Sequence, residues 1–500
     1  YKRQGMVLRL ARARCYTGAV NADIELYAEL AAVAVVLFYV LAIVSAVEAV
    51  LKTRTAQGAI AWIISLLTFP FVAVPLYLVF GRNRFDGYLE DRVEIEEQTV
   101  KLIRETRGSI EEHVIPPSDE LPLYNSLFKL ARLPATTGNR ATLLINGQAT
   151  FDDILAGLHS AQRCILFEFY IIRDDDLGRE LGRVLMEKAK AGVRVFMLYD
   201  EIGSRSFQRS RLHKQLLMTG VKVAAFNTTQ GRRNRFQLNF RNHRKIVVVD
   251  NHMAWIGGHN VGVEYLGQDK RFGHWRDTHV RLEGPSVLGA ELAFATDWRW
   301  ATKQQLDIDW DFDGPAVGDS RVLVFPSDPA SEFEEAGLMY HELIVCARKR
   351  IWIASPYFVP DRAIISALQL AALRGVDVRV IIPDEPDGPL VGMANWSSTS
   401  ELLPAEVKVY RYRGGFMHQK VFLMDDQLAG VGTANFDNRS FRLNFEITAL
   451  VHDPAFAAEV EDMLEADMRR SLQVTRQDID SKPAWFVFAM GAARLMSPVL

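Results

Sequence analysis

An eight-residue motif occurs twice in this 500-residue chain, and the two copies are in register. The first copy reads His243-Arg-Lys-Ile-Val-Val-Val-Asp250, and the second reads His418-Gln-Lys-Val-Phe-Leu-Met-Asp425. A glycine turn that ends in asparagine follows each copy, at residues 257–260 and 432–435. Every element of the second copy lies 175 residues after its counterpart (418 − 243 = 175, and 435 − 260 = 175). Two copies in one register indicate an internal repeat, so the fold must contain two similar halves.

The segments around each copy predict alternating strands and helices. A strand, helix and strand of this length form a right-handed parallel crossover. The sequence therefore predicts an α/β fold with two pseudo-symmetric α/β/α domains and mixed sheets, at residues 136–315 and 316–500. An Asp-rich stretch near 305–320 is predicted to link them. The expected elements are a strand at 165–172, a helix at 174–192 and a strand at 193–199, repeated at 350–355, 360–375 and 376–382.

Two apolar stretches without charged residues, 30–47 and 55–81, precede the α/β part. The first would form a helix of about 27 Å, which is long enough to cross the hydrocarbon core of a membrane. We therefore predict a transmembrane hairpin at 29–81 with helices at about 30–50 and 58–80. A cleaved signal peptide followed by a core helix is the alternative. The length of the first stretch and the presence of a second argue against it.

Basic residues flank both apolar stretches. The positive-inside rule then predicts that both ends lie in the cytoplasm and that the short loop lies outside. This predicts a multi-pass membrane protein whose large C-terminal part lies in the cytoplasm. Residues 1–28 form a basic arm with no predicted fold, and residues 82–135 read as a charged helical linker. The net charge of −3 gives no general attraction for nucleic acid, so we expect no nucleic-acid partner.

The repeated histidine, lysine and asparagine indicate phosphate chemistry. Lysine and asparagine donate hydrogen bonds to oxyanions, and one histidine can attack phosphorus while another transfers protons. This division of labour needs no metal or cofactor, and it requires the two half-sites to face one another. The candidate catalytic residues are His243, Lys245, Asp250, His418, Lys420 and Asp425, and the candidate phosphate-binding residues are Lys245, Asn260, Lys420 and Asn435.

Each histidine should also have a carboxylate on its second ring nitrogen. The candidates are Asp277 and Glu446, each of which follows its own half-site. Asp250 and Asp425 lie seven residues after their histidines, so we interpret them as structural ion-pair or turn residues despite their place in the motif. The spacings of His252, His259, His274 and His279 fit no metal-ligand pattern. The aromatic stretch 436–445, which includes Arg439 and Arg442, fits a packed core and an acyl-chain entrance equally well.

The doubled motif resembles the signature of the phospholipase D superfamily over roughly residues 136–500. Three further segments are similar to those of bacterial cardiolipin synthases: Thr55-Ala-Gln-Gly-Ala-Ile-Ala-Trp62, Gly415-Phe-Met-His-Gln-Lys420 and Asn438-Arg-Ser-Phe-Arg-Leu-Asn-Phe-Glu446. The resemblance implies transfer of a phosphatidyl group from one phosphatidylglycerol to another with release of glycerol. By the same analogy, His243 is the nucleophile and His418 the acid and base, and the reaction passes through a phosphohistidine.

Other functions use the same residues. A phospholipase D-type hydrolase would let water attack the intermediate, and a nuclease of the superfamily would share the motifs but suits an acidic membrane chain poorly. A non-enzymatic scaffold would not need both complete half-sites. The second lipid substrate and the formation of a homo-oligomer are left open.

Overall fold

The computed structural model describes residues 2–53, 55–81, 85, 111–116, 122–227, 229, 239–310 and 316–496, with side chains described from residue 26 onward. The chain divides into two units, Tyr1–Arg84 and Phe85–Leu500, each of which is described by itself. Most of the predicted charged linker at 82–135 lies outside the described residues.

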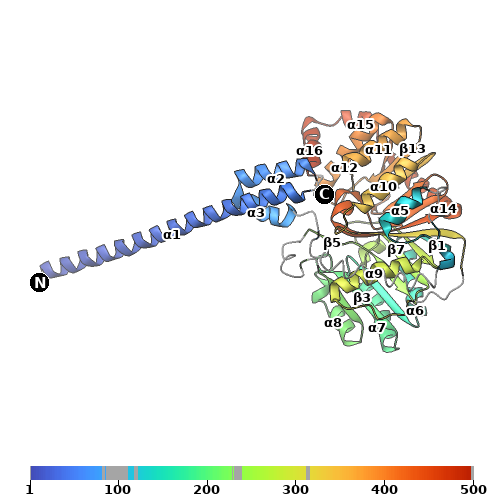
Figure 1. Cartoon of the computed structure of the whole chain (residues 1–500), viewed down its shortest axis with the longest axis horizontal. Helices are drawn as coiled ribbons and strands as arrows, with labels where there is room; N and C mark the ends of the chain where they lie inside the picture. Colours follow the sequence, from blue (N-terminus) through green and yellow to red (C-terminus); the bar gives the residue numbers. More distant parts are fainter. Residues whose placement is uncertain are drawn as a thin grey trace. The chain divides into compact units, whose positions relative to one another are not determined.

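The first unit is dominated by one long helix, α1 (Lys2–Lys52), which contains both the predicted basic arm and the first apolar stretch (Figure 1). Residues Leu26–Lys52 are long and apolar enough to cross a membrane. Only 11% of the most apolar 18-residue window is buried, so this segment is not the core helix of a soluble domain.

The second apolar stretch is not the single helix that the sequence predicted. It forms α2 (Ala56–Thr68), α3 (Pro70–Leu76) and a short π-helix, η1 (Tyr77–Gly81). The break falls at Phe69, whose φ of −133° and ψ of 58° are not helical, because proline disfavours the α conformation in the residue before it. A hairpin of two spanning helices is therefore not confirmed. The buried side chains of Ala42, Ala46 and Ala49 of α1 pack with Leu66 of α2 and Tyr77.

The second unit is built from two halves that repeat one strand order. The first half contains β1 (Thr136–Ile145), β2 (Cys164–Phe169), β3 (Arg194–Asp200), β4 (Lys222–Phe226), β5 (Arg241–Asn242), β6 (Ile246–Val249), β7 (Met253–Gly257), β8 (Trp275–Arg276) and β9 (Thr278–Glu283). The second half contains β10 (Ser320–Ser327), β11 (Arg350–Ala354), β12 (Phe358–Val359), β13 (Asp377–Pro383), β14 (Lys408–Tyr412), β15 (Phe416–Met417), β16 (Val421–Met424), β17 (Leu428–Gly432), β18 (Phe436–Asp437), β19 (Asn444–His452) and β20 (Ser471–Gln473).

The two strand orders are β1-β9-β7-β6-β2-β3-β4 and β10-β19-β17-β16-β11-β13-β14, and antiparallel pairing of β1 with β10 joins them into one mixed sheet. Strand β1 pairs with β10 up to Asn139 and with β9 from Arg140 onward, and the irregularity just before this change contains Gly138, whose φ of 79° strongly favours glycine. The predicted parallel crossovers are confirmed, since β2 pairs parallel with β3 and β11 pairs parallel with β13.

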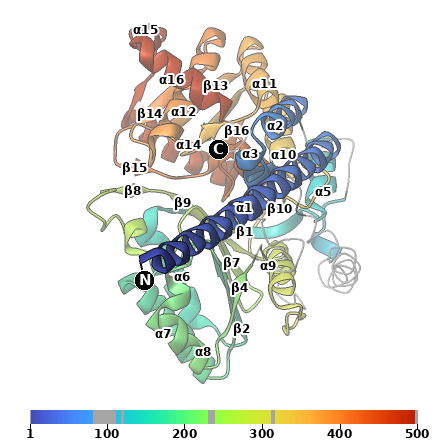
Figure 2. The same cartoon turned by 90° about the vertical axis from the view of Figure 1, so that its left-hand side faces the viewer.

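Helices cover the sheet in each half. They are α5 (Pro122–Ala131), α6 (Asn146–Ser160), α7 (Asp176–Lys190), α8 (Arg211–Met218), α9 (Val287–Thr302), α10 (Glu335–Cys346), α11 (Arg362–Leu373), α12 (Pro389–Leu402), α13 (Asn438–Arg442), α14 (Pro454–Arg469), α15 (Arg476–Asp480) and α16 (Ala484–Leu495). Figure 2 shows α6, α7 and α8 gathered on the first half, and α11, α12, α15 and α16 on the second. Helix α5 lies in the predicted linker but packs in the core of the second half through Leu127.

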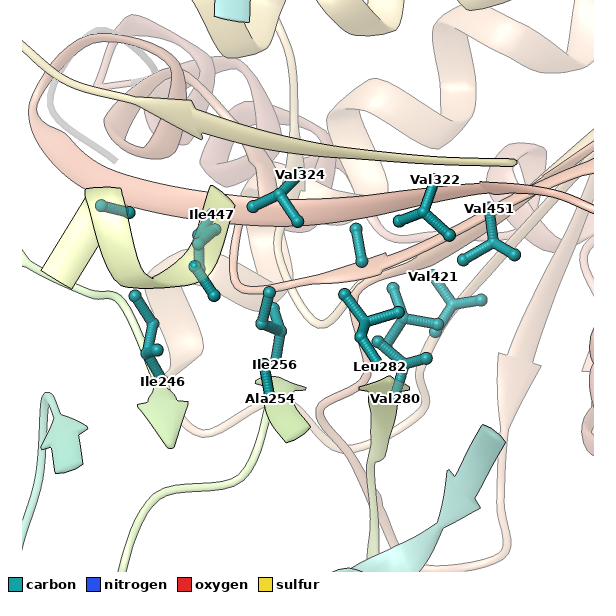
Figure 3. Packing of buried hydrophobic residues seen from close by; sticks show 14 of the residues in the cluster. Ile246, Ala254, Ile256, Val280, Leu282, Val322, Val324, Val421, Ile447 and Val451 are labelled. Carbon is teal, nitrogen blue, oxygen red and sulfur yellow. The ribbon is translucent and has the colours of Figure 1, made fainter. Parts of the chain in front are cut away.

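A shared core holds the two halves together. Ile246, Ile256 and Leu282 of the first half face Val324, Val421 and Ile447 of the second (Figure 3). Because both faces of each half-sheet are buried, Ile246 and Val248 enter this shared core while Val247 and Val249 enter the outer core of the first half. Residues 311–315 of the predicted linker near 305–320 lie outside the described residues. Within the described part of this linker, Asp309 forms an ion pair with Arg194 at 2.8 Å.

Candidate active site

The two motif histidines line one cavity of about 410 Å³ at the junction of the two halves. His243 lies in the extended segment directly before β6, and His418 occupies the same position before β16. Both side chains are nearly buried, with one edge toward the cavity. The facing half-sites that the chemistry required are therefore present in the described structure.

Each histidine is held by a carboxylate from the other half. His243 Nδ1 lies 2.9 and 3.0 Å from the two carboxylate oxygens of Glu446, and His418 Nδ1 lies 2.8 Å from Oδ2 of Asp277. Both carboxylates were predicted from the sequence, in which each follows its own half-site. The structure exchanges the partners.

Two short parallel strand pairs cause this exchange. Strand β5 pairs with β19, which sets Arg241 opposite Asn444 and brings Glu446 to His243. Strand β15 pairs with β8, which sets Met417 opposite Arg276 and so brings the next residue, Asp277, to His418. Both ladders run between the halves, so the backbone itself places each carboxylate across the junction.

The two carboxylates differ in their further partners, and this explains a difference between the two glycine turns. In the second half, Thr433 Oγ1 donates to Glu446 at 2.6 Å. In the first half the equivalent residue is Gly258, where a Cβ would lie only 2.0 Å from Oδ1 of Asp277. Threonine therefore supports one carboxylate, and glycine leaves room for the other.

Both carboxylates remain ionised despite their burial. Burial raises the pKa of Glu446, but the charges of His243 and Lys245 outweigh it and hold the pKa below its usual value. Burial likewise raises the pKa of Asp277, and the neighbouring Lys420 leads the opposing charges that hold that pKa well below its usual range. Each carboxylate can therefore accept a hydrogen bond from the Nδ1–H group of its histidine, which leaves Nε2 unprotonated.

Burial lowers the pKa of His243 to about 4 and that of His418 to about 3. The carboxylates oppose these shifts, and the nearby lysines add to them. Both imidazoles are consequently neutral at neutral pH when the cavity holds no anion. A neutral imidazole can act as a nucleophile, and a bound phosphate would favour protonation of the second one.

The two lysines lie behind the histidines. Lys245 Nζ donates to the carbonyl oxygen of His243 at 2.6 Å, and Lys420 Nζ lies 2.8 and 3.1 Å from the two ring nitrogens of His418. Burial lowers the pKa of Lys245 to about 7 and that of Lys420 to about 8. Both are charged over part of the neutral range, and so they can act as hydrogen-bond donors to an oxyanion.

The two asparagines also line the cavity, in unlike surroundings. Asn260 accepts from the backbone N–H of Ile171 at 3.0 Å and donates to the hydroxyl of Tyr265 at 3.1 Å. Among the described residues, Oδ1 of Asn435 is buried without a hydrogen-bond partner. An unpartnered buried polar atom on a cavity wall is expected where a ligand supplies the missing contact.

The two motif aspartates accept hydrogen bonds from backbone N–H groups and do not line the cavity. Asp250 accepts hydrogen bonds from the N–H groups of Gln162, Arg163 and Cys164 at 2.6–2.8 Å. Asp425 accepts from the N–H groups of Arg348, Lys349 and Arg350. Both aspartates have positive φ, at 54° and 52°, in the turn that ends their strand. They are turn residues, and grouping them with the catalytic candidates is not supported by their positions.

Several cavity residues were not selected from the sequence. Tyr170 lies edge-on to His243 with ring centroids 5.1 Å apart, and Tyr357 lies edge-on to His418 at 6.4 Å. A repeat could have found them, because a tyrosine precedes an aspartate by four residues in both Tyr170-Ile-Ile-Arg-Asp174 and Tyr357-Phe-Val-Pro-Asp361. Arg241, Trp275 and Asp437 also line the cavity.

The aromatic stretch 436–445 divides between core and cavity. Phe436, Phe441 and Phe445 are buried in the core, which excludes these rings from an acyl-chain entrance. Arg439 lines the cavity, whereas Arg442 pairs with Glu334 at 2.9 Å.

The remaining histidines form no metal centre in the described part of the chain, where no group of three His, Cys, Asp or Glu residues could hold an ion. His259 and His279 are buried against each other, with their Nδ1 atoms 2.9 Å apart.

Comparison with known proteins identifies the family. A family model described as the phospholipase D-like domain of cardiolipin synthase matches residues 154–270 and 340–468. Cardiolipin synthase A of Pseudomonas fluorescens is 44% identical over 471 residues, which cover 93% of this chain and 98% of that protein. Cardiolipin synthase A of Pseudomonas aeruginosa (strain LESB58) is 45% identical over 470 residues, which cover 92% and 94%. The chain belongs to the cardiolipin synthases of the phospholipase D superfamily.

Two further comparisons concern the N-terminal region and the fold. A family model for the phospholipase D-nuclease N-terminal region matches residues 40–82, the end of α1 together with α2 and α3. The crystal structure of phosphatidylserine synthase from Haemophilus influenzae shares the fold with a TM-score of 0.59 at 17% identity, covering 76% of this chain and all of that one.

Proposed function

We propose that this cardiolipin synthase transfers a phosphatidyl group from one phosphatidylglycerol to a second and releases glycerol. The observation that carries the proposal is the pair of histidines on one cavity, each oriented through Nδ1 by a carboxylate of the opposite half. This arrangement supplies a nucleophile and a proton carrier on one phosphorus atom, and the family relationship supports the lipid substrate.

In the first step, Nε2 of His243 forms a bond to the phosphorus of phosphatidylglycerol while the bond from phosphorus to the glycerol oxygen breaks. The departing oxygen takes a proton from His418, which takes up that proton from solvent when the negatively charged phosphate binds and raises its pKa. In the second step, His418 accepts the proton of a hydroxyl group on the second phosphatidylglycerol. That oxygen then attacks phosphorus and releases His243.

The charge on the phosphoryl oxygens is stabilised by Lys245 and Lys420, assisted by the amides of Asn260 and Asn435. Donors fixed in a buried site are effective because they need no reorganisation as charge develops. Glu446 and Asp277 keep each imidazole in the reactive tautomer.

The competing function is hydrolysis of the same intermediate by water. The aromatic walls of the cavity, which include Tyr170, Trp275 and Tyr357, favour a lipid hydroxyl over water. Incubation of the purified protein with phosphatidylglycerol, followed by thin-layer chromatography, decides between them. Cardiolipin and glycerol in equal amounts are expected, whereas phosphatidate as the main product would overturn the transferase in favour of the hydrolase.

We further propose that Leu26–Lys52 spans the inner membrane and that α2 and α3 complete a second pass, leaving both ends of the chain in the cytoplasm. The exposed apolar side chains of α1 and the basic residues on both flanks support this orientation.

A further inference from the structure

Helix α16 near the C-terminal end of the described chain is apolar on both of its faces. Met490 and Ala493 are buried on the inner face. The outer face exposes Trp485, Phe488 and Leu495, at 65%, 79% and 81% of their surfaces. A helix that is apolar all round is normally enclosed on every side, so the outer face needs an occupant.

The helix carries almost no charge that would favour water. Its single charged residue, Arg494, pairs with Glu401 at 3.3 Å. At its N-terminal end, the ammonium group of Lys482 lies over the rings of Trp396 and Phe486, at 4.5 and 5.2 Å. The outer face is thus apolar and lies between two basic residues.

The inner face connects α16 to the catalytic cavity. Ala493 packs with Ala394 of α12 and with Val359 of β12. Val359 also lines the cavity, together with Val391 in the first turn of α12. A partner bound to the outer face of α16 would therefore be separated from the cavity wall only by this helix.

We propose that the outer face of α16 inserts into the interfacial layer of an anionic phospholipid bilayer and so holds the cavity against the lipid surface. Twelve residues make a helix of about 18 Å, which is too short to cross a hydrocarbon core of about 30 Å but suits a helix lying in the membrane plane. Tryptophan is favoured at the depth of the lipid headgroups, where Trp485 would lie.

Charge complementarity and sequence position support this occupant. Lys482 at the N-terminal end complements anionic headgroups, whereas the charge of Arg494 at the other end is compensated by Glu401. The helix lies after residue 468, beyond the segments that the family models match, so those matches assign it no role.

A label on the outer face tests the insertion without any need for turnover. The substitution Phe488→Cys is made in the whole protein with Cys15→Ser and Cys346→Ser, and an environment-sensitive fluorophore is attached to the new cysteine. The labelled protein is then reconstituted in phosphatidylglycerol vesicles. We expect a blue-shifted emission that is quenched more by lipids with a quencher near the headgroup than by lipids with a quencher deep in the acyl chain. The matched control is Met218→Cys on α8, whose native side chain is 86% exposed and which should give the emission of a label in water.

Either of two fluorescence results would overturn the proposal. A label at residue 488 that behaves like the label at 218, or that is shielded from water without quenching by any lipid, would mean that solvent or a protein covers this face. Stronger quenching from deep in the bilayer would mean that the helix does not lie in the membrane plane. Because the readout is binding, these failures are distinct from a failure of the proposed transferase activity.

The rate of turnover provides a second test of the proposal. The double variant Trp485→Ser, Phe488→Ser should lose about tenfold in rate on phosphatidylglycerol vesicles, because it removes two apolar anchors, and should keep its rate on phosphatidylglycerol in detergent micelles. Met218→Ser should leave both rates unchanged. Equal losses in vesicles and micelles would indicate a structural role, and no loss in either would show that the face is not needed. Both results contradict the proposal.

Discussion

Nδ1 of each histidine lies within hydrogen-bond distance of a buried carboxylate, and the proposed mechanism depends on these two contacts. The variants Glu446→Gln and Asp277→Asn keep the size of the side chain but replace the acceptor that selects the tautomer. We expect turnover to fall by a factor on the order of 10² to 10⁴ in each, as for the loss of general acid–base catalysis. Steady-state rates on phosphatidylglycerol measure this.

The motif aspartates provide the matched control. Asp250→Asn should lower the melting temperature, because Asp250 accepts three backbone hydrogen bonds, and should leave the shape of the pH–rate profile unchanged. A profile in Asp250→Asn altered like that of Glu446→Gln would assign the motif aspartate a chemical role that its position does not suggest.

The assignment of roles to the two histidines makes a separate prediction. Rapid quenching with labelled phosphatidylglycerol, followed by peptide mapping under alkaline conditions, should recover the label on the peptide that contains His243. The label should be absent in His243→Ala, and both His243→Ala and His418→Ala should lack turnover. Recovery of the label on the His418 peptide would reverse the roles.

The pKa values of the histidines and lysines set the pH dependence of kcat/KM, which reports the free enzyme. Burial lowers the pKa of His243 to about 4, so the nucleophile is neutral well below pH 6.5 and the acid limb should lie nearer pH 4. The pKa values of Lys245 and Lys420 are lowered to about 7 and about 8, so the donors lose their protons, and the rate falls, as the pH rises through that range. Because the four groups interact, each limb of the pH–rate profile gives an apparent pKa of the whole cluster and not that of a single residue.

Arginine substitutions test the origin of the alkaline limb. Lys245→Arg and Lys420→Arg should move this limb to higher pH, because the guanidinium group stays charged, even where the maximal rate is reduced. An alkaline limb that stays in place in both variants would show that other groups cause it.

At the scale of elements, the β5–β19 and β15–β8 ladders bring the two half-sites together, and one buried ion pair secures the second of them. Arg276 of β8 donates to both carboxylate oxygens of Asp467 on α14, with the closest contact at 2.8 Å, and both side chains are buried. Arg276→Met should destabilise the fold by about 3–5 kcal/mol, because it leaves a carboxylate buried without its partner. Chemical denaturation measures the change.

An exposed pair of similar geometry is the control. Arg183 and Glu187 of α7 lie 2.8 Å apart with about half of each side chain exposed, and Arg183→Met should cost less than about 1 kcal/mol. Equal effects of Arg276→Met and Arg183→Met would mean that the buried pair does not secure the junction.

The elements also show what local sequence could predict. Helix α7 and its flanking strands were predictable because the signals are local: Asp175 caps the helix, its apolar residues share one face, and Gly192 follows its end. The register of the repeat likewise identified His243 and His418. The exchange of Glu446 and Asp277 was not predictable, because it depends on which strands pair between the halves. The break at Phe69 was not predictable from the apolar pattern, because that pattern is continuous and a proline does not always interrupt a membrane helix.

At the scale of the whole molecule, the topology of the chain in the membrane can be tested directly. A cysteine introduced at Met218, on the exposed end of α8, should resist a membrane-impermeant thiol reagent in intact cells and react after lysis. A cysteine at Thr53, in the loop after α1, should react in intact cells if α2 and α3 complete a second pass. Labelling of residue 218 from outside would contradict the cytoplasmic orientation.

The pairing of each histidine with a carboxylate 203 or 141 residues away in sequence limits how such a protein could have arisen. A half-length forerunner with one motif could not have oriented its own histidine with its own carboxylate in this geometry. It would have needed a second copy of itself, arranged about a twofold axis, with each subunit lending its carboxylate to the other. Within one chain the two halves are free to differ at equivalent positions, as Gly258 and Thr433 do.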